Sequence, residues 1–282
     1  MPSDPEPGVA PDPPSPSVRP DPPTSSGQKV PLSTADEGGF CTLGGGAGGG
    51  GGGAGGGGGS EVLLMLLADA RLPTGAHTQS AGLEPAMRQG LSLAQVPAYI
   101  RTRLRTVVAV EAGAAVVARH VAVAGPADLA DGLRAVDDAW RARTISPALR
   151  ENAEGLGRGY ARLVTGLWPD APASGALRAV RRPTRAVAIG VAGALAGLAA
   201  ARVARLIGYD DAQTVAAAAL KLDPLDPLVA TGWVVQLAGD IERMADAVAT
   251  LTSPDQIPAT TAPLIEQWAQ VHAVTGQRLF RA

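Results

Sequence analysis

The chain has 282 residues, of which 46% are hydrophobic but only 3% aromatic, and a formal net charge of −2. Ala, Leu and Val must therefore build the core, and the near-neutral charge argues against a nucleic-acid-binding surface. The single cysteine, Cys41, excludes an intrachain disulfide and fits a reducing compartment. The acidic, proline-rich N-terminus lacks the basic and apolar stretches of a secretory signal, so we expect a cytoplasmic protein.

Residues 1–60 are predicted to form a disordered, low-complexity tail. They hold half of the 36 glycines, and residues 44–59 are almost pure glycine. Such segments bury too little apolar surface to offset the entropy of ordering, and a polyglycine run is typical of a flexible tether. The run is not followed by lysine, so it does not match a phosphate-binding loop. Residues 61–282 then form one folded domain.

From Glu61 onward, apolar residues recur at the three- and four-residue spacing of amphipathic helices. No segment alternates β-branched and polar residues as a strand would. The repeating stripes lie at residues 96–121, 129–140, 149–167, 233–251 and 264–271. The sequence therefore predicts an all-α protein: a single helical bundle domain of about eight to ten helices joined by short turns.

Capping residues mark several of the expected helix ends. Ser146, which precedes a proline, is predicted to be an N-cap. The helix over residues 96–121 starts either at the capping-box pair Ser92 and Gln95 or at Pro97. Gly208 is predicted to end a helix, because glycine readily adopts the C-cap conformation.

Three glycines among alanines, Gly190, Gly193 and Gly197, give one predicted helix a face of small residues. In a membrane such a face favours helix dimerisation. The uncharged run over residues 186–201 would span about 24 Å as a helix, less than the roughly 30 Å of a bilayer core. We therefore expect this helix to pack closely against its neighbours inside the bundle, and we expect no membrane partner.

Two aspartate pairs, Asp137-Asp138 and Asp210-Asp211, raise the hypothesis of an all-α metal-dependent transferase. A shared metal needs carboxylates three or four residues apart on one helix face, whereas adjacent helical residues point about 100° apart. Asp210 and Asp211 are instead expected to cap a helix N-terminus after Gly208. The transferase stays as the alternative from the enzyme class, and it would require acidic side chains that converge from distant segments.

No other residues form a local pattern for catalysis or metal binding. The histidines are not at metal-ligand spacing, although a transient metal contact by His77 or His272 is an alternative. Nucleophile motifs are absent, and residues 61–282 hold no cysteine. We expect a protein that is not an enzyme and binds no cofactor itself. Lys221, the only lysine of the folded part, is either a cation at a helix C-terminus or a mobile ammonium at a partner surface.

The segment over residues 63–84 resembles the N-terminal signature of the urease accessory protein F family (UreF), in its actinobacterial form. An apolar stretch is followed by Leu-Pro-x-Gly and then by Ser-x-Gly-Leu-Glu. The matching residues are Leu72, Pro73, Gly75, Ser80, Gly82, Leu83 and Glu84. The last five residues, 278–282, resemble the family ending Arg-Leu-Phe-Arg-Ser, with His272 at the place of the tail histidine. The resemblance covers residues 61–282.

The sequence departs from the family pattern at four positions. Asp226 and Pro227 stand where the family usually has Gly-Gln, Ala273 replaces a glutamate, and Ala282 replaces the closing serine. The departures at Asp226 and Pro227 suggest a further alternative, a diverged helical interaction protein without a role in urease maturation.

The resemblance implies a non-enzymatic adaptor or chaperone that matures urease. UreF-like proteins form a homodimer, bind the accessory protein called D or H, and recruit the GTPase accessory protein G, and the assembly delivers nickel to apo-urease. Nickel and GTP are then handled by the partner proteins, and modulation of the partner's GTPase is a further expected effect.

The resemblance also assigns roles to particular residues. Those expected to contact partners are Lys221, His272, Arg278, Leu279, Phe280 and Arg281. Phe280 would anchor in a partner groove with arginines on the rim; the alternative is a tail folded back onto its own bundle. Pro73 and Gly75 are expected to set the turn after the first helix, and Glu84 to lie in the first turn of the next.

Overall fold

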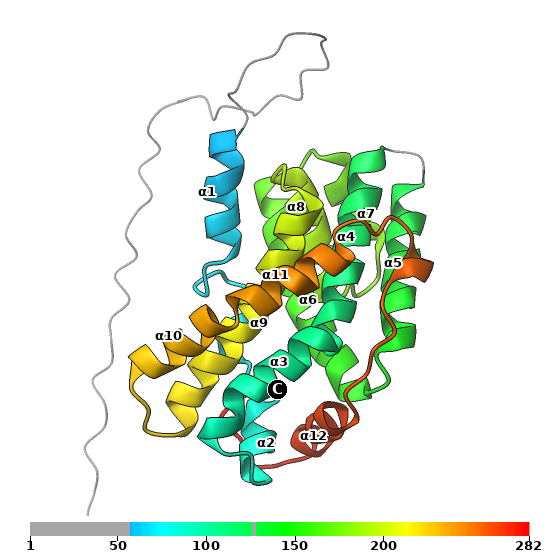
Figure 1. The fold of residues 1–282 in the computed structure, drawn as a ribbon. Helices are drawn as coiled ribbons and strands as arrows, with labels where there is room; N and C mark the ends of the chain where they lie inside the picture. The colour runs from blue at the N-terminus through cyan, green and yellow to red at the C-terminus, as the bar shows by residue number, and fades with distance from the viewer. Residues whose placement is uncertain (1–56, 126–127, 282) are drawn as a thin grey trace, which may run out of the picture. The chain divides into compact units, whose positions relative to one another are not determined.

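The computed structural model describes residues 57–125 and 128–281 of the chain. Within them there are twelve α-helices, three short 3-10 helices and no strand (Figure 1). The α-helices are α1 (Gly57–Leu67), α2 (Leu83–Arg88), α3 (Val96–Arg105), α4 (Val107–Ala124), α5 (Leu129–Arg143), α6 (Pro147–Leu167), α7 (Pro172–Ala179), α8 (Arg185–Leu195), α9 (Ala200–Leu222), α10 (Pro227–Gln236), α11 (Ala238–Val248) and α12 (Pro263–Ala273). The predicted all-α class is confirmed.

Two of the predicted helices are each interrupted at one residue. The stripe over residues 96–121 is divided at Thr106, whose φ of −125° and ψ of −101° separate α3 from α4. The stripe over residues 233–251 is divided at Leu237, between α10 and α11. Apolar spacing continues through both breaks, so the stripes could not show them. Counting each broken pair as one helix gives ten, within the predicted range, for the part of the chain described.

The predicted N-terminal caps are largely confirmed. The Ser146 hydroxyl accepts a hydrogen bond from the Leu149 amide, 3.3 Å away, at the start of α6. Ser92 and Gln95 form the predicted capping box at the 3-10 helix Leu93–Gln95. Helix α3 follows directly, with Pro97 in its first turn, so both predicted start signals, the capping box and the proline, mark a helix start. Asp226, a departure from the family pattern, is the N-cap of α10 and accepts from the Leu228 amide at 2.9 Å.

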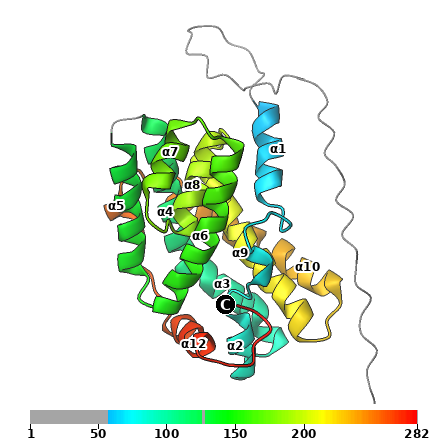
Figure 2. The same ribbon diagram turned by 180° about the vertical axis from the view of Figure 1, so that it is seen from behind.

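The small-residue face of α8 packs closely against its neighbours α4 and α9, as the sequence predicted. Gly197 is not part of this face: it lies beyond the end of α8, in the connection to α9, with a φ of +68°. Helices α4 and α8 are side by side in both views (Figures 1 and 2). A Cβ added at Gly190 would lie 2.6 Å from the Ala118 Cβ of α4, and one at Gly193 would lie 2.5 Å from Val203 of α9. Glycine therefore sets the spacing of the central helices, whose buried side chains are mainly Ala, Val, Leu and Ile.

The prediction that Gly208 ends a helix is wrong. It lies inside α9, where an added Cβ would come within 2.7 Å of Met244 and 3.0 Å of Ile241 on α11. Gly208 allows α9 and α11 to approach each other closely. The residues around a glycine in the sequence do not show whether it serves such an approach or caps a helix.

The predicted tail over residues 1–60 lies mostly outside the described residues. The first described helix begins at Gly57, within the glycine run and four residues before the predicted boundary at Glu61. Glu61 in this helix pairs with Arg202 of α9.

By length and composition, residues 93–124 are apolar enough to cross a membrane. Half of the most apolar 18-residue window in this segment is buried inside the bundle, and α4 packs against α5, α8 and α9. The apolar composition of α4 is that of a core helix, and the segment gives no support for a membrane span.

Two glycines of α6 provide a matched test of this packing. We predict that Gly157→Ala lowers the free energy of unfolding by at least about 2 kcal/mol, because its Cβ would overlap the Pro183 carbonyl. A Cβ at Gly155 would contact only the flexible Arg158 side chain. Gly155→Ala should therefore raise the free energy of unfolding by about 0.5–1 kcal/mol, because alanine has the higher helix propensity. Urea unfolding measures both, and equal effects would contradict the close approach.

Candidate functional site

The N-terminal motif forms the turn that the sequence predicted. Gly75 and Gly82 have φ angles of +87° and +78°, a backbone region that favours glycine. A Cβ at Gly82 would also lie 2.9 Å from the Tyr99 hydroxyl, which donates a 2.7 Å hydrogen bond to the Ala81 carbonyl. The turn therefore leads into α2 with a fixed geometry, and Glu84 lies in the first turn of that helix as expected.

The motif turn also packs against α6. A Cβ at Gly159 would lie 2.8 Å from the Thr74 Cα, so the backbone of the turn lies directly on this helix. Ser80 and Leu83 are fully buried, and the Glu84 amide donates to the Ser80 hydroxyl at 3.4 Å. These contacts hold Glu84 in one place.

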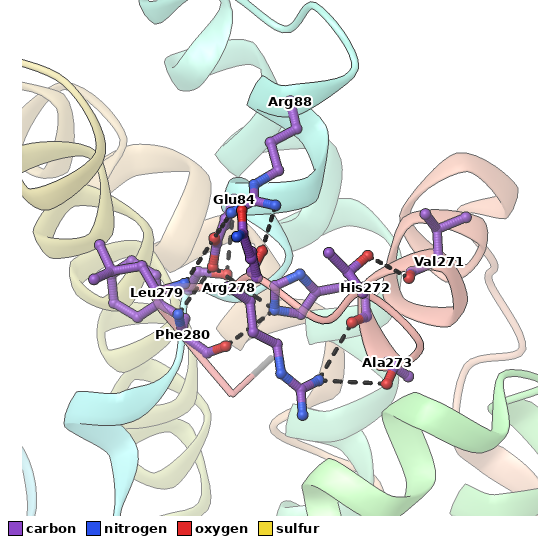
Figure 3. A network of polar contacts seen from close by, with 11 residues as sticks. Glu84, Arg88, Val271, His272, Ala273, Arg278, Leu279 and Phe280 are labelled. Atoms are coloured by element: carbon purple, nitrogen blue, oxygen red, sulfur yellow. Dashed lines mark hydrogen bonds and ion pairs between the residues drawn. The ribbon is translucent and has the colours of Figure 1, made fainter. Parts of the chain in front are cut away.

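The Glu84 carboxylate binds the C-terminal tail (Figure 3). Its side chain is 1% exposed, and its two oxygens accept hydrogen bonds from the Leu279 amide at 2.8 Å and the Phe280 amide at 2.9 Å. Arg88, one turn further along α2, pairs with the same carboxylate at 2.8 Å. A buried carboxylate needs such charge-assisted donors, so the tail and the motif stabilise each other.

Further backbone contacts hold the tail along the same surface. The Arg281 amide donates to the Thr78 carbonyl at 2.9 Å, and Arg88 donates to the Gln277 carbonyl at 2.5 Å. His272 of α12, 2% exposed, lies with its Nε2 3.2 Å from the Phe280 carbonyl. We call residues 277–281 together with Glu84, Arg88 and His272 the tail clasp.

Lys221 lies at the end of α9, which confirms its prediction as a helix C-terminal cation. Its Nζ is 5.2 Å from the centre of the Phe280 ring and donates to the His77 carbonyl at 3.4 Å. The same ammonium therefore helps to retain the tail through a cation–π contact.

The structure adopts the second of the two predicted arrangements of the tail, the one folded back onto its own bundle. Phe280 is only 4% exposed, so in this conformation it is not available as a partner anchor. The physical reason is the buried Glu84, which takes up the tail amides. Leu279 is 61% exposed, and Arg278 and Arg281 are exposed beside it. Contact between these residues and a partner stays a prediction.

Three of the four paired aspartates lie in ion pairs with arginines. Asp211 pairs with Arg103 at 2.6 Å, Asp210 with Arg185 at 3.1 Å, and Asp137 with Arg141 at 2.6 Å, whereas Asp138 is exposed. The prediction that Asp210 and Asp211 cap a helix is wrong, because both lie in the middle of α9. Among the described residues, no three His, Cys, Asp or Glu side chains are placed to hold a metal ion.

The ion pairs of Asp210 and Asp211 belong to a buried cluster that the sequence did not reveal. Arg185 lies between Asp210 and Glu111, with its Nε 3.4 Å from Glu111. Burial raises the pKa of both carboxyl groups, and the neighbouring Arg185 partly counteracts the rise. The cluster joins α3, α4, α8 and α9 in the centre of the bundle.

The fold and the tail clasp define the class of protein: an all-α helical bundle whose C-terminal tail is held by a glutamate of its N-terminal motif. The family model of UreF matches residues 92–238. Together with the relatives described next, this match shows that the chain belongs to the UreF family of urease accessory proteins.

Mycobacterial proteins are among the similar relatives. The urease accessory proteins UreF of Mycobacterium bovis and Mycobacterium tuberculosis are each 37% identical over 220 residues, covering 76% of this chain and 95% of the relative. That of Mycobacterium marinum is 36% identical over 219 residues, with the same shares covered.

We predict that Glu84→Gln lowers the free energy of unfolding by roughly 2–3 kcal/mol. The amide keeps the shape of the side chain but places a donor against the buried tail amides, which lose a hydrogen bond. Glu242→Gln makes the same change in an exposed pair with Arg205 and should cost less than about 1 kcal/mol. Similar losses in both variants by urea unfolding would show that the clasp contributes no special stability.

The buried cluster predicts a pH dependence. The pKa of Glu111 in the folded chain is raised above its ordinary value of 4.5, so Glu111 holds a proton more tightly in the folded chain than in the unfolded chain. As pH rises and this proton is lost, Glu111 therefore lowers the free energy of unfolding. Glu111→Gln should therefore gain stability relative to the unmodified chain between pH 5 and pH 7. Urea unfolding at both pH values measures the difference, and a difference that stays constant or falls would contradict the raised pKa.

Proposed function

We propose that this chain is a non-enzymatic adaptor of urease maturation, working in the cytoplasm. It assembles as a homodimer with the accessory protein D or H and with the GTPase accessory protein G, and the assembly delivers nickel into apo-urease. Membership of the UreF family and similarity to urease accessory proteins UreF of mycobacteria support this role. Nickel is cargo in this proposal, GTP belongs to protein G, and modulation of that GTPase is part of the same proposal.

The observation that carries the proposal is the outward Leu279 on a fixed tail. Its backbone amide is bound to Glu84 while its side chain is 61% exposed between Arg278 and Arg281. An exposed apolar side chain with arginines around it has the composition of an interface centre and rim. Because the tail is already ordered on the bundle, a partner that binds it loses less conformational entropy.

The metal-dependent transferase is not proposed. Its acidic pairs would have to converge on a metal, and Asp137, Asp210 and Asp211 each bond an arginine instead. The diverged interaction protein rested on Asp226-Pro227, and these residues have a local role as the N-cap and first residue of α10.

The proposal predicts that Leu279→Asp prevents assembly while leaving the fold intact. The full chain would be co-expressed with the D or H and G accessory proteins of the same urease system, and the mass of the purified complex read by light scattering. The substitution places a charge on an exposed side chain and keeps the backbone amide that binds Glu84. We expect complex formation by the unmodified chain and at least a tenfold weaker complex for the variant.

Leu167→Asp is the matched control, because Leu167 is 47% exposed at the last residue of α6 and is not part of the tail clasp. It should assemble as the unmodified chain does. Absence of any complex with the folded, unmodified chain would refute the adaptor proposal, and equal assembly of both variants would refute the role of Leu279.

A further inference from the structure

Two hollows adjoin the C-terminal tail. One, of about 440 Å³, lies between the motif turn, α6 and α12. The other, of about 360 Å³, lies beside Lys221 and His77. Thr78, Arg278 and Arg281 line both, so the hollows meet along the tail. We call the two together the tail cleft.

The tail cleft has an excess of positive charge. Its lining includes Arg158 and Lys221 as well as Arg278 and Arg281, against the single carboxylate of Glu151. Within the described residues, none of these four cations has a carboxylate within ion-pair distance.

Most other described arginines do have such a partner. The positive charge of the cleft therefore differs from the balanced surface of a chain whose net charge is −2.

The shape of the cleft indicates the kind of ligand. Cations lie along both hollows, from Arg158 on α6 to Lys221 at the end of α9, so a single small anion would meet only part of them. The backbone amides of Leu279, Phe280 and Arg281 are already used within the chain, which leaves side chains to recognise the ligand. Guanidinium groups bind carboxylates through paired, charge-assisted hydrogen bonds.

We infer that the tail cleft binds an extended acidic segment of a partner polypeptide, whose carboxylates pair with Arg158, Arg278, Arg281 and Lys221. The inference rests on the proposed function, because it assigns a chemistry to the partner that meets the tail. It adds Arg158 of α6 to the expected partner contacts and places Lys221 of α9 on the same binding surface. The exposed Leu279 provides the neighbouring apolar contact.

The test uses the full chain and a fluorescein-labelled peptide of ten glutamates, with a ten-residue Gly-Ser peptide as the neutral probe. Binding is measured by fluorescence anisotropy at low and at physiological salt. We expect the acidic peptide to bind, the neutral peptide not to bind, and affinity to fall with salt. Residues 61–282 carry a formal charge of only +2, and a control variant outside the tail cleft distinguishes specific binding from a general attraction.

Paired variants locate the site. Arg158→Gln with Arg281→Gln should weaken binding about fivefold, since each exposed pair contributes a modest interaction. The corresponding double Lys variant keeps both charges and should restore most of the affinity. Arg181→Gln removes an exposed arginine from the connection between α7 and α8, outside the tail cleft, and should change nothing.

Three outcomes would overturn the inference. They are no binding of the acidic peptide, equal weakening of binding by the control and by the double Gln variant, and displacement of the peptide by inorganic phosphate at 1 mM. Displacement by phosphate would indicate a site for small anions.

The peptide test needs no accessory protein. Peptide binding without an accessory complex would therefore refute the adaptor proposal alone, and a complex without peptide binding would refute the tail cleft alone.

Discussion

The Glu84 carboxylate is the contact on which the arrangement of the candidate site depends. It is buried at the start of α2 and accepts the amides of Leu279 and Phe280. A buried carboxylate without these donors would be costly, and a tail without this acceptor would have two unsatisfied amides beside the core. One interaction therefore joins the N-terminal motif to the C-terminal tail and fixes which tail side chains face inward and which face outward.

Arginine has two different uses in this fold. In the core, Arg103 and Arg185 pair with carboxylates of α4 and α9 and hold the central helices together. Around the tail, Arg158 and Arg281 have exposed side chains and no carboxylate partner among the described residues. The buried arginine pairs make the central helices a rigid scaffold. The exposed arginines around the tail keep their charge available at a surface that this scaffold holds in place.

Much of the fold could be predicted from the sequence, because helical periodicity and N-caps such as Ser146 are local signals. The breaks at Thr106 and Leu237 could not, since apolar spacing runs through both. Gly208 and Asp211 were misassigned for one reason: their roles depend on helices far away in sequence. The two ends of the candidate site were found through family resemblance. Their contact was missed, because nothing local connects Glu84 to an amide 195 residues later.

The most direct test of the account is hydrogen exchange of the Leu279 and Phe280 amides in the full, unmodified chain, measured alone and with the accessory proteins. We predict slow exchange in the free chain, comparable to that of amides inside α6, because Glu84, which accepts both hydrogen bonds, is buried. We also predict that protection persists in the complex, where the tail binds as an ordered element. Exchange at the rate of an unstructured peptide in the free chain would contradict the clasp and the ordered tail on which the proposed function depends.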